Sequence, residues 1–180
     1  ADVILLPEIP YSVDAIVEKI NRRRAHGSTF SVIAVAEGAM STQTAAELET
    51  LRSIVKDASS PENKARAKQH VKELEAAQRA NIFTLAEQLE HATGLEARVS
   101  ILGYVQRGGV PCGADRLLAT RLGSAGAAAI EAGRFGVTVA DRSHGTQLVP
   151  LKDVAGKVKY VPTNHEWIRA AREVGTALGD

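Results

Sequence analysis

The residues best suited to chemistry lie in a glycine-rich stretch of the sequence. The apolar run 99–102 reads as a buried strand, and it leads into Tyr104 and Arg107. A Gly-Gly pair and a proline then force a turn, and a long helix is expected to begin near Gly113. Loop amides, a helix N-terminus and a guanidinium can together bind a phosphate. We therefore predict an anion site here; the alternative is a turn in which Arg107 only pairs with Asp115.

Two further charged residues flank predicted strands. The nearly continuous apolar run 30–36 predicts a parallel strand buried on both faces, and Glu37 follows it directly. Arg98 stands at the entrance of the strand 99–102. Ligands of open α/β sheets bind beyond the carboxyl ends of strands. A carboxylate can accept hydrogen bonds from sugar hydroxyls and arginines can bind a phosphate dianion, so these residue types would suit a sugar phosphate. The alternatives are a salt bridge for Glu37, a surface charge for Arg98 and a packed aromatic ring for Tyr104.

Strand and helix patterns alternate along the chain, which predicts an α/β fold with a largely parallel sheet flanked by helices. Residues 41–79 differ, because two charged helical segments with few apolar anchors predict a helical hairpin lying on the surface. The remaining expected elements are strands at 3–6, 136–140 and 147–151, a helix from Ser12 to Gly27, one from a capping box Thr84-x-x-Glu87 to Gly94, one from Gly113 to Gly133, and a last helix capped by Thr163 or Asn164 with Trp167, Ile168, Ala171 and Val174 on its inner face.

Composition narrows the possible functions. The net charge is +1 over 180 residues and aromatic residues make up 4%, so neither nucleic acid nor a membrane surface is an expected partner. The single cysteine, Cys112, cannot form an internal disulfide, which fits a reducing cytoplasm, and a space-filling role suits it better than a catalytic one. The five histidines are scattered without paired spacing, so no metal site is expected.

The glycine-rich stretch resembles the sugar-phosphate half of the phosphofructokinase family. The segment 103–109, Gly-Tyr-Val-Gln-Arg-Gly-Gly, matches that family's Gly-His/Tyr-x-Gln-Arg-Gly-Gly, and Asp115-Arg116-x-x-Ala119-x-Arg121-x-Gly123 matches the start of the helix that follows. The segments 2–8 and 161–172 also resemble family members, the latter the tail of longer ones. Residues 41–79 match less well and are expected to be an insertion.

The resemblance implies a role for each candidate residue. Glu37 matches a glutamate that binds the sugar of fructose 6-phosphate, and Arg107 matches a sugar-phosphate arginine. Arg98 matches an arginine that reaches the 6-phosphate across a subunit interface, which implies a homo-oligomer, either a dimer or a tetramer. Tyr104 stands where many members have a phosphate-binding histidine, and a tyrosine at this position is similar to members that include pyrophosphate users. The implied function is that of a 6-phosphofructokinase of glycolysis; the alternative is a non-catalytic sugar-phosphate-binding or regulatory module.

Several family motifs have no counterpart in this sequence. The phosphate-binding Gly-Gly-Asp loop, the Thr-x-Asp motif with its catalytic base and the Met-Gly-Arg motif are all missing. We therefore expect residues 1–180 to be the sugar-phosphate-binding portion of a larger protein, with Mg²⁺ and ATP or pyrophosphate bound by an absent half. No catalytic residue is assigned to this chain, which should be inactive alone. The turn 26–29 lacks the basic residues of allosteric members, so only Asp2 points to that regulation.

Overall fold

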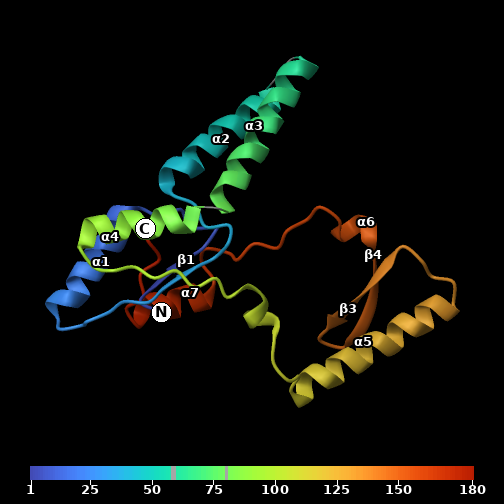
Figure 1. The fold of residues 1–180 in the computed structure, drawn as a ribbon. Coiled ribbons are helices and arrows are strands. Elements are labelled where there is room, and N and C mark those ends of the chain that lie inside the picture. The colour runs from blue at the N-terminus through green and yellow to red at the C-terminus, as the bar shows by residue number, and fades with distance from the viewer. Residues whose placement is uncertain (58–59, 80) are drawn as a thin grey trace. The chain divides into compact units, whose positions relative to one another are not determined.

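The computed structural model describes residues 1–57, 60–79 and 81–180, and it divides into two compact units (Figure 1). Unit 1 comprises residues 1–100 and 160–180, and unit 2 comprises residues 101–159. Both ends of the chain therefore belong to unit 1, and unit 2 is formed by a continuous internal segment. The predicted α/β class is confirmed, because helices accompany a parallel strand pair in unit 1.

The sheet of unit 1 is small and built around its first strand. Strand β1 (Val3–Leu5) pairs in parallel with β2 (Ile33–Val35), with Leu5 opposite Val35. On its other side β1 bridges to Ala177, whose carbonyl accepts a hydrogen bond from Ile4 N at 2.9 Å. Strand β1 is therefore bonded on both edges, and the side chains of Val3 and Leu5 are fully buried.

Two helices supply most of the apolar cover of unit 1. Helix α1 (Val13–Ala25) buries Ile16 and Ile20, and α4 (Asn81–Thr93) buries Leu85 and Leu89. The expected helix between Ser12 and Gly27 is confirmed. The expected capping box of α4 is wrong, because that helix begins at Asn81 and so includes both Thr84 and Glu87. The core shared by these elements consists of Val3, Leu5, Tyr11, Ile16, Ile20, Ala39, Leu85 and Leu89.

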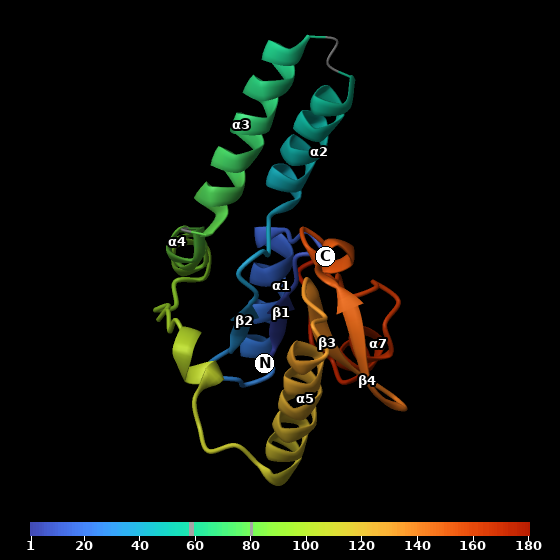
Figure 2. The ribbon, with the colours of Figure 1, turned by 90° about the vertical axis from the view of Figure 1, so that its right-hand side faces the viewer.

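Residues 41–79 form the expected pair of helices. Helix α2 (Thr42–Asp57) and helix α3 (Pro61–Arg79) lie side by side (Figure 2). Leu48 of α2 and Ala67 of α3 are buried, whereas most described side chains of α3 are exposed. This agrees with the predicted surface hairpin; that it is an insertion stays a prediction.

Helix α7 (Glu166–Glu173) closes unit 1 and corrects two details. Its N-cap is His165, whose Nδ1 accepts a hydrogen bond from Trp167 N at 3.2 Å, rather than Thr163 or Asn164. Ile168 is buried as expected, but Trp167 is 76% exposed and Val174 is also exposed. A helix of only eight residues offers one narrow buried stripe, so neighbours of Ile168 in sequence turn away from the core.

Unit 2 consists of a long helix beside a two-stranded sheet. The 3-10 helix η1 (Gly103–Arg107) precedes α5 (Gly113–Glu131), which is followed by β3 (Val137–Arg142), β4 (Gly145–Pro150) and the short α6 (Leu151–Val154). Strands β3 and β4 confirm the two expected strands, but they pair antiparallel instead of extending a parallel sheet. The two residues between Arg142 and Gly145 leave room only for a tight hairpin turn, which imposes that direction.

Candidate functional site

The expected strand at 99–102 does not form. No residue from Val99 to Leu102 is in a strand, and Ile101 is 73% exposed. An apolar run becomes a strand only where a neighbouring strand takes up its backbone groups. Strand β1 is bonded on both sides by β2 and by Ala177, and the described residues 99–102 do not pair with the remaining edge of β2. Arg98 and Tyr104 are therefore not separated by a strand.

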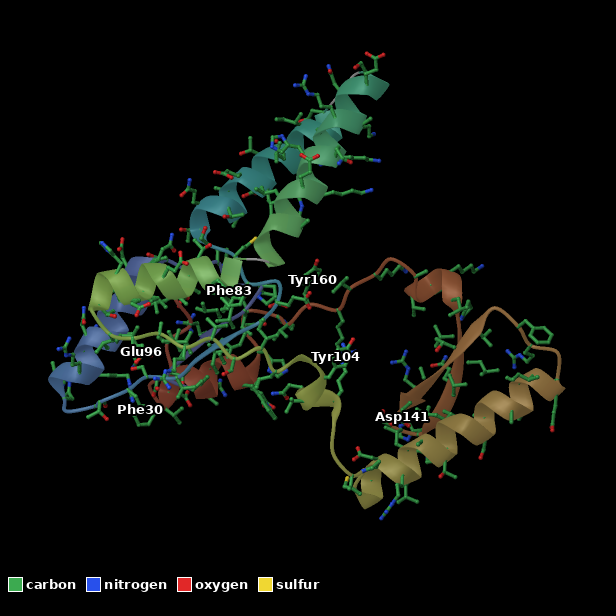
Figure 3. The ribbon with its side chains drawn as sticks, viewed as in Figure 1. Phe30, Phe83, Glu96, Tyr104, Asp141 and Tyr160 are labelled. Atoms are coloured by element: carbon green, nitrogen blue, oxygen red, sulfur yellow. The ribbon has the colours of Figure 1, made fainter. Side chains whose placement is uncertain are left out.

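Tyr104 and Arg107 lie on η1 in unit 2, three residues apart. In a 3-10 helix side chains at i and i+3 eclipse one another, so the two side chains share one side of η1. Tyr104 is 88% exposed and projects from the ribbon (Figure 3), which excludes the packed aromatic alternative within unit 2. The side chain of Arg107 makes no hydrogen bond or ion pair with the described residues. Its five N–H donors are thus available for a ligand of unit 2's surface.

The alternative pairing of Arg107 with Asp115 is not observed. Asp115 Oδ2 instead accepts a hydrogen bond from the backbone N–H of Cys112 at 2.9 Å, at the start of α5. Hydrogen bonds from the Cys112 thiol and then from its backbone N–H lower the pKa of Asp115. The carboxylate therefore stays ionised at neutral pH and occupies the Cys112 amide. The Cys112 amide is therefore not available to the anion site predicted here.

Glu37 follows β2 in unit 1, at the edge where parallel strands present their carboxyl ends. The turn 36–39 is closed by a hydrogen bond from Ala39 N to the Ala36 carbonyl at 2.9 Å. Gly38 lies against Pro7, since a Cβ built on Gly38 would be 3.2 Å from Pro7 Cγ. The segments that follow β1 and β2 are therefore in contact, and the side chain of Glu37 is exposed on the turn. This is the position that open α/β sheets use for ligands.

Arg98 lies on the segment between α4 and the end of the first part of unit 1. Its guanidinium Nε donates to Glu96 Oε1 at 2.9 Å, and 83% of its side chain is exposed. Glu96 appears on this segment in Figure 3. A pair this exposed contributes little to stability, about 0–1 kcal/mol, so Arg98 can exchange Glu96 for another anion.

The four candidate residues are divided between the units, with Glu37 and Arg98 in unit 1 and Tyr104 and Arg107 in unit 2. Two shallow cavities lie elsewhere. One of about 320 Å³ adjoins the turn after α1 and the other, of about 280 Å³, lies between α5 and β4. Neither is lined by a candidate residue.

Two further residues order the candidate regions, and sequence reasoning assigned them no such role. Glu8 follows β1, and its Oε1 accepts a hydrogen bond from Val161 N at 2.8 Å. In unit 2, Arg121 of α5 forms a 2.9 Å ion pair with Asp141 of β3, which is labelled in Figure 3. The motif residues Asp115 and Arg121 are therefore both bonded within unit 2. Of these bonds, the sequence carried a signal only for the one between Asp115 and Cys112, because a carboxylate three residues after a helix N-cap is a recognised capping pattern.

The described residues hold no cluster of three or more His, Cys, Asp or Glu side chains that could bind a metal ion. In the same part of the chain, no helix has the length and apolar character to cross a bilayer.

These observations define an α/β protein with an arginine-bearing glycine loop and a carboxylate at a sheet edge. A family model described as Phosphofructokinase matches residues 1–130. An ATP-dependent 6-phosphofructokinase of Propionibacterium freudenreichii subsp. shermanii is 59% identical over 180 residues, which are 100% of this chain and 48% of that relative. Namesakes from Spirochaeta thermophila and Chloroflexus aggregans are 41% and 36% identical over 99% and 100% of the chain, and 44% of each relative. The chain belongs to the phosphofructokinase family and spans about half the length of these relatives.

Proposed function

We propose that this chain is the sugar-phosphate-binding part of a 6-phosphofructokinase, a transferase that converts fructose 6-phosphate to fructose 1,6-bisphosphate in glycolysis. The observation that carries the proposal is the 59% identity, along the whole chain, to a relative named ATP-dependent 6-phosphofructokinase. The glycine loop supports it, because Arg107 is exposed there without an internal partner among the described residues.

Each candidate residue has a distinct task in this proposal. Arg107 binds the phosphate of the sugar through a planar fork of donors, and Tyr104 offers its hydroxyl from the same side of η1. Glu37 accepts hydrogen bonds from sugar hydroxyls. Arg98 serves the 6-phosphate bound by a neighbouring subunit, so the enzyme is a homo-oligomer. In phosphoryl transfer such groups act by positioning the substrate and neutralising its charge.

The phosphodonor of the proposed enzyme is ATP, as the names of the relatives suggest. ATP with Mg²⁺ supplies the transferred phosphoryl group and neutralises its charge, and we assign neither to residues of this chain. Pyrophosphate is the alternative donor, because the family members with a tyrosine at position 104 include pyrophosphate users. We place the reaction in the cytoplasm, where a lone cysteine stays reduced.

The proposal is tested by replacing Arg107 in the full-length enzyme. Loss of a charge-assisted phosphate contact costs about 1.5–3 kcal/mol, so Arg107→Ala should raise the KM for fructose 6-phosphate about 10- to 150-fold. Arg134→Ala is the matched control, because it removes the same charge from an exposed position of unit 2. The control should keep KM within about twofold.

Unchanged sugar-phosphate kinetics in Arg107→Ala would count decisively against this site. Calorimetric titration of the wild-type protein with fructose 6-phosphate separates the enzyme from the alternative. Binding without turnover, with ATP and with pyrophosphate, would identify a non-catalytic sugar-phosphate-binding module instead.

A further inference from the structure

Among the described residues of unit 2, none packs over the loop between η1 and α5. Every residue from Ile101 to Thr120 is exposed, including the loop 108–112. Gly109 has a φ of +106°, a backbone conformation that residues with a side chain rarely adopt. Two consecutive glycines make this loop flexible unless other bonds hold it. Within unit 2, hydrogen bonds must therefore set the conformation of this loop, which begins directly after Arg107 of η1.

Two hydrogen bonds hold the ends of the loop. At its start, Gly108 N donates to the Val105 carbonyl at 3.2 Å. At its end, Cys112 N donates to Asp115 Oδ2 at 2.9 Å. Pro111 has no N–H, and the N–H groups of Gly109 and Val110 have no partner among the described residues. In the described structure the end of the loop is therefore held by Asp115, which bonds both the backbone amide and the thiol of Cys112.

The position of Asp115 favours this hydrogen bond. It is the third residue of α5, where the helix dipole favours a carboxylate. The hydrogen bonds from Cys112 lower the pKa of Asp115, so the carboxylate is ionised and able to accept throughout the neutral range. Asp115 Oδ2 faces the backbone amide of Cys112. As an anion, the carboxylate would repel a phosphate, so Asp115 does not itself bind the ligand.

We propose that Asp115 is a positioning residue for the sugar phosphate, acting through the Cys112 amide to fix the loop that directly follows Arg107. The carboxylate does not touch the substrate. By fixing Cys112 it sets where the loop ends, and so restricts the two open amides of Gly109 and Val110, which lie two and three residues after Arg107. A preorganised loop binds more tightly because less conformational freedom is lost on binding. The inference rests on the proposed function and deepens it.

The test compares four variants of the full-length enzyme with the wild type at neutral pH. Asp115→Ala removes the acceptor, and should raise the KM for fructose 6-phosphate by about three- to tenfold, with kcat and the KM for ATP unchanged. Asp115→Asn keeps an acceptor oxygen and should stay within about twofold of the wild type. Asp141→Ala is the matched control, since it breaks an ion pair of unit 2 outside the loop, and Arg107→Ala reports on the site itself.

Amide hydrogen exchange gives a readout that does not need turnover. In Asp115→Ala, exchange of residues 108–112 should accelerate, whereas Asp141→Ala should leave those amides as they are. A merely structural role for Asp115 would change stability but would not separate the two substrates' KM values or be rescued by asparagine.

The outcomes distinguish this inference from the function on which it rests. If Arg107→Ala weakens sugar-phosphate binding while Asp115→Ala does not, the positioning role is wrong and the proposed site stands. If Arg107→Ala also has no effect, the proposed site is wrong, and the exchange data then decide whether Asp115 orders the loop. Equal KM increases in Asp115→Ala and Asp141→Ala would overturn the inference. So would a tenfold increase in Asp115→Asn, even if Asp115→Ala did not fold.

Discussion

Replacing Gly179 by alanine should destabilise unit 1 more than the same replacement at Gly175. The two glycines have nearly the same backbone conformation, with φ of +85° and +84°. They differ in surroundings. A Cβ on Gly179 would lie 2.7 Å from Tyr11 Cβ and 2.8 Å from Leu5 Cδ2, whereas nothing lies within 4 Å of one on Gly175.

The expected changes in the free energy of unfolding come from two costs: the left-handed backbone conformation and the steric clash of the added methyl group. An alanine in the left-handed region costs about 1–2 kcal/mol, and this cost applies to both variants. At Gly179 the methyl group must also displace Leu5 and Tyr11, which are 0% and 4% exposed. Overpacking of this kind costs about 1–3 kcal/mol more. Gly175→Ala should therefore lose about 1–2 kcal/mol and Gly179→Ala about 2–5 kcal/mol.

Equilibrium unfolding in urea measures both variants on the 180-residue chain. Amide hydrogen exchange of β1 at each urea concentration reports on unit 1, because Val3 and Leu5 of β1 lie in its core. The difference between the two variants isolates the clash, because the conformational term cancels. Equal losses in the two variants, with unchanged urea dependence, would refute the close packing of residue 179 against β1.

Three further predictions concern pH, the hairpin and the isolated chain. The hydrogen bond from Arg172 lowers the pKa of Asp180, so this half-exposed pair stabilises the fold above the ordinary carboxyl pKa of about 3.9 and ceases to do so as the pH falls through the lower folded value. Asp180→Asn should thus cost about 0.2–1 kcal/mol at pH 7 and progressively less as the pH falls below about 3.9, measured by urea unfolding at a series of pH values. Shortening the hairpin 41–79 in the full-length enzyme should leave kcat nearly intact, and loss of activity in a folded oligomer would contradict its peripheral role. The isolated chain should show no turnover above a blank in a coupled assay with fructose 6-phosphate, Mg²⁺ and either donor; turnover abolished by Glu37→Gln would contradict this.

Elements with local signals were predictable from the sequence. Helix α1 follows from one apolar face ending at Gly27, and α5 from the turn before Gly113 and the small residues after it. The direction of β3 and β4 was not predicted, because pairing depends on a turn of two residues rather than on either strand's own pattern. The strand expected at 99–102 failed for a related reason. Its apolar pattern is present, but the neighbour that a strand requires is not set by its own sequence.

The candidate site was predictable as residue types and much less as contacts. The exposure of Tyr104 and the free donors of Arg107 agree with residues that serve a ligand. The Arg107–Asp115 pair, which was the alternative to an anion site, is not formed, but the bond from the Cys112 amide to Asp115 was not predicted. Likewise, the ion pair between Arg98 and Glu96 depends on an irregular segment that no periodicity describes.

Strand β1 obtains its two neighbours from opposite ends of the sequence, with Ile33 on one side of Val3 and Ala177 on the other. During synthesis the segment around Ala177 is made long after β1 has left the ribosome. At about 5–20 residues per second, the delay is on the order of ten seconds or more. For that time the nascent chain carries an unpaired sheet edge beside Val3 and Leu5, whose side chains are fully buried in the finished structure. Chaperones that hold unfolded chains would be expected to act on this protein during that interval, before residue 177 completes the sheet.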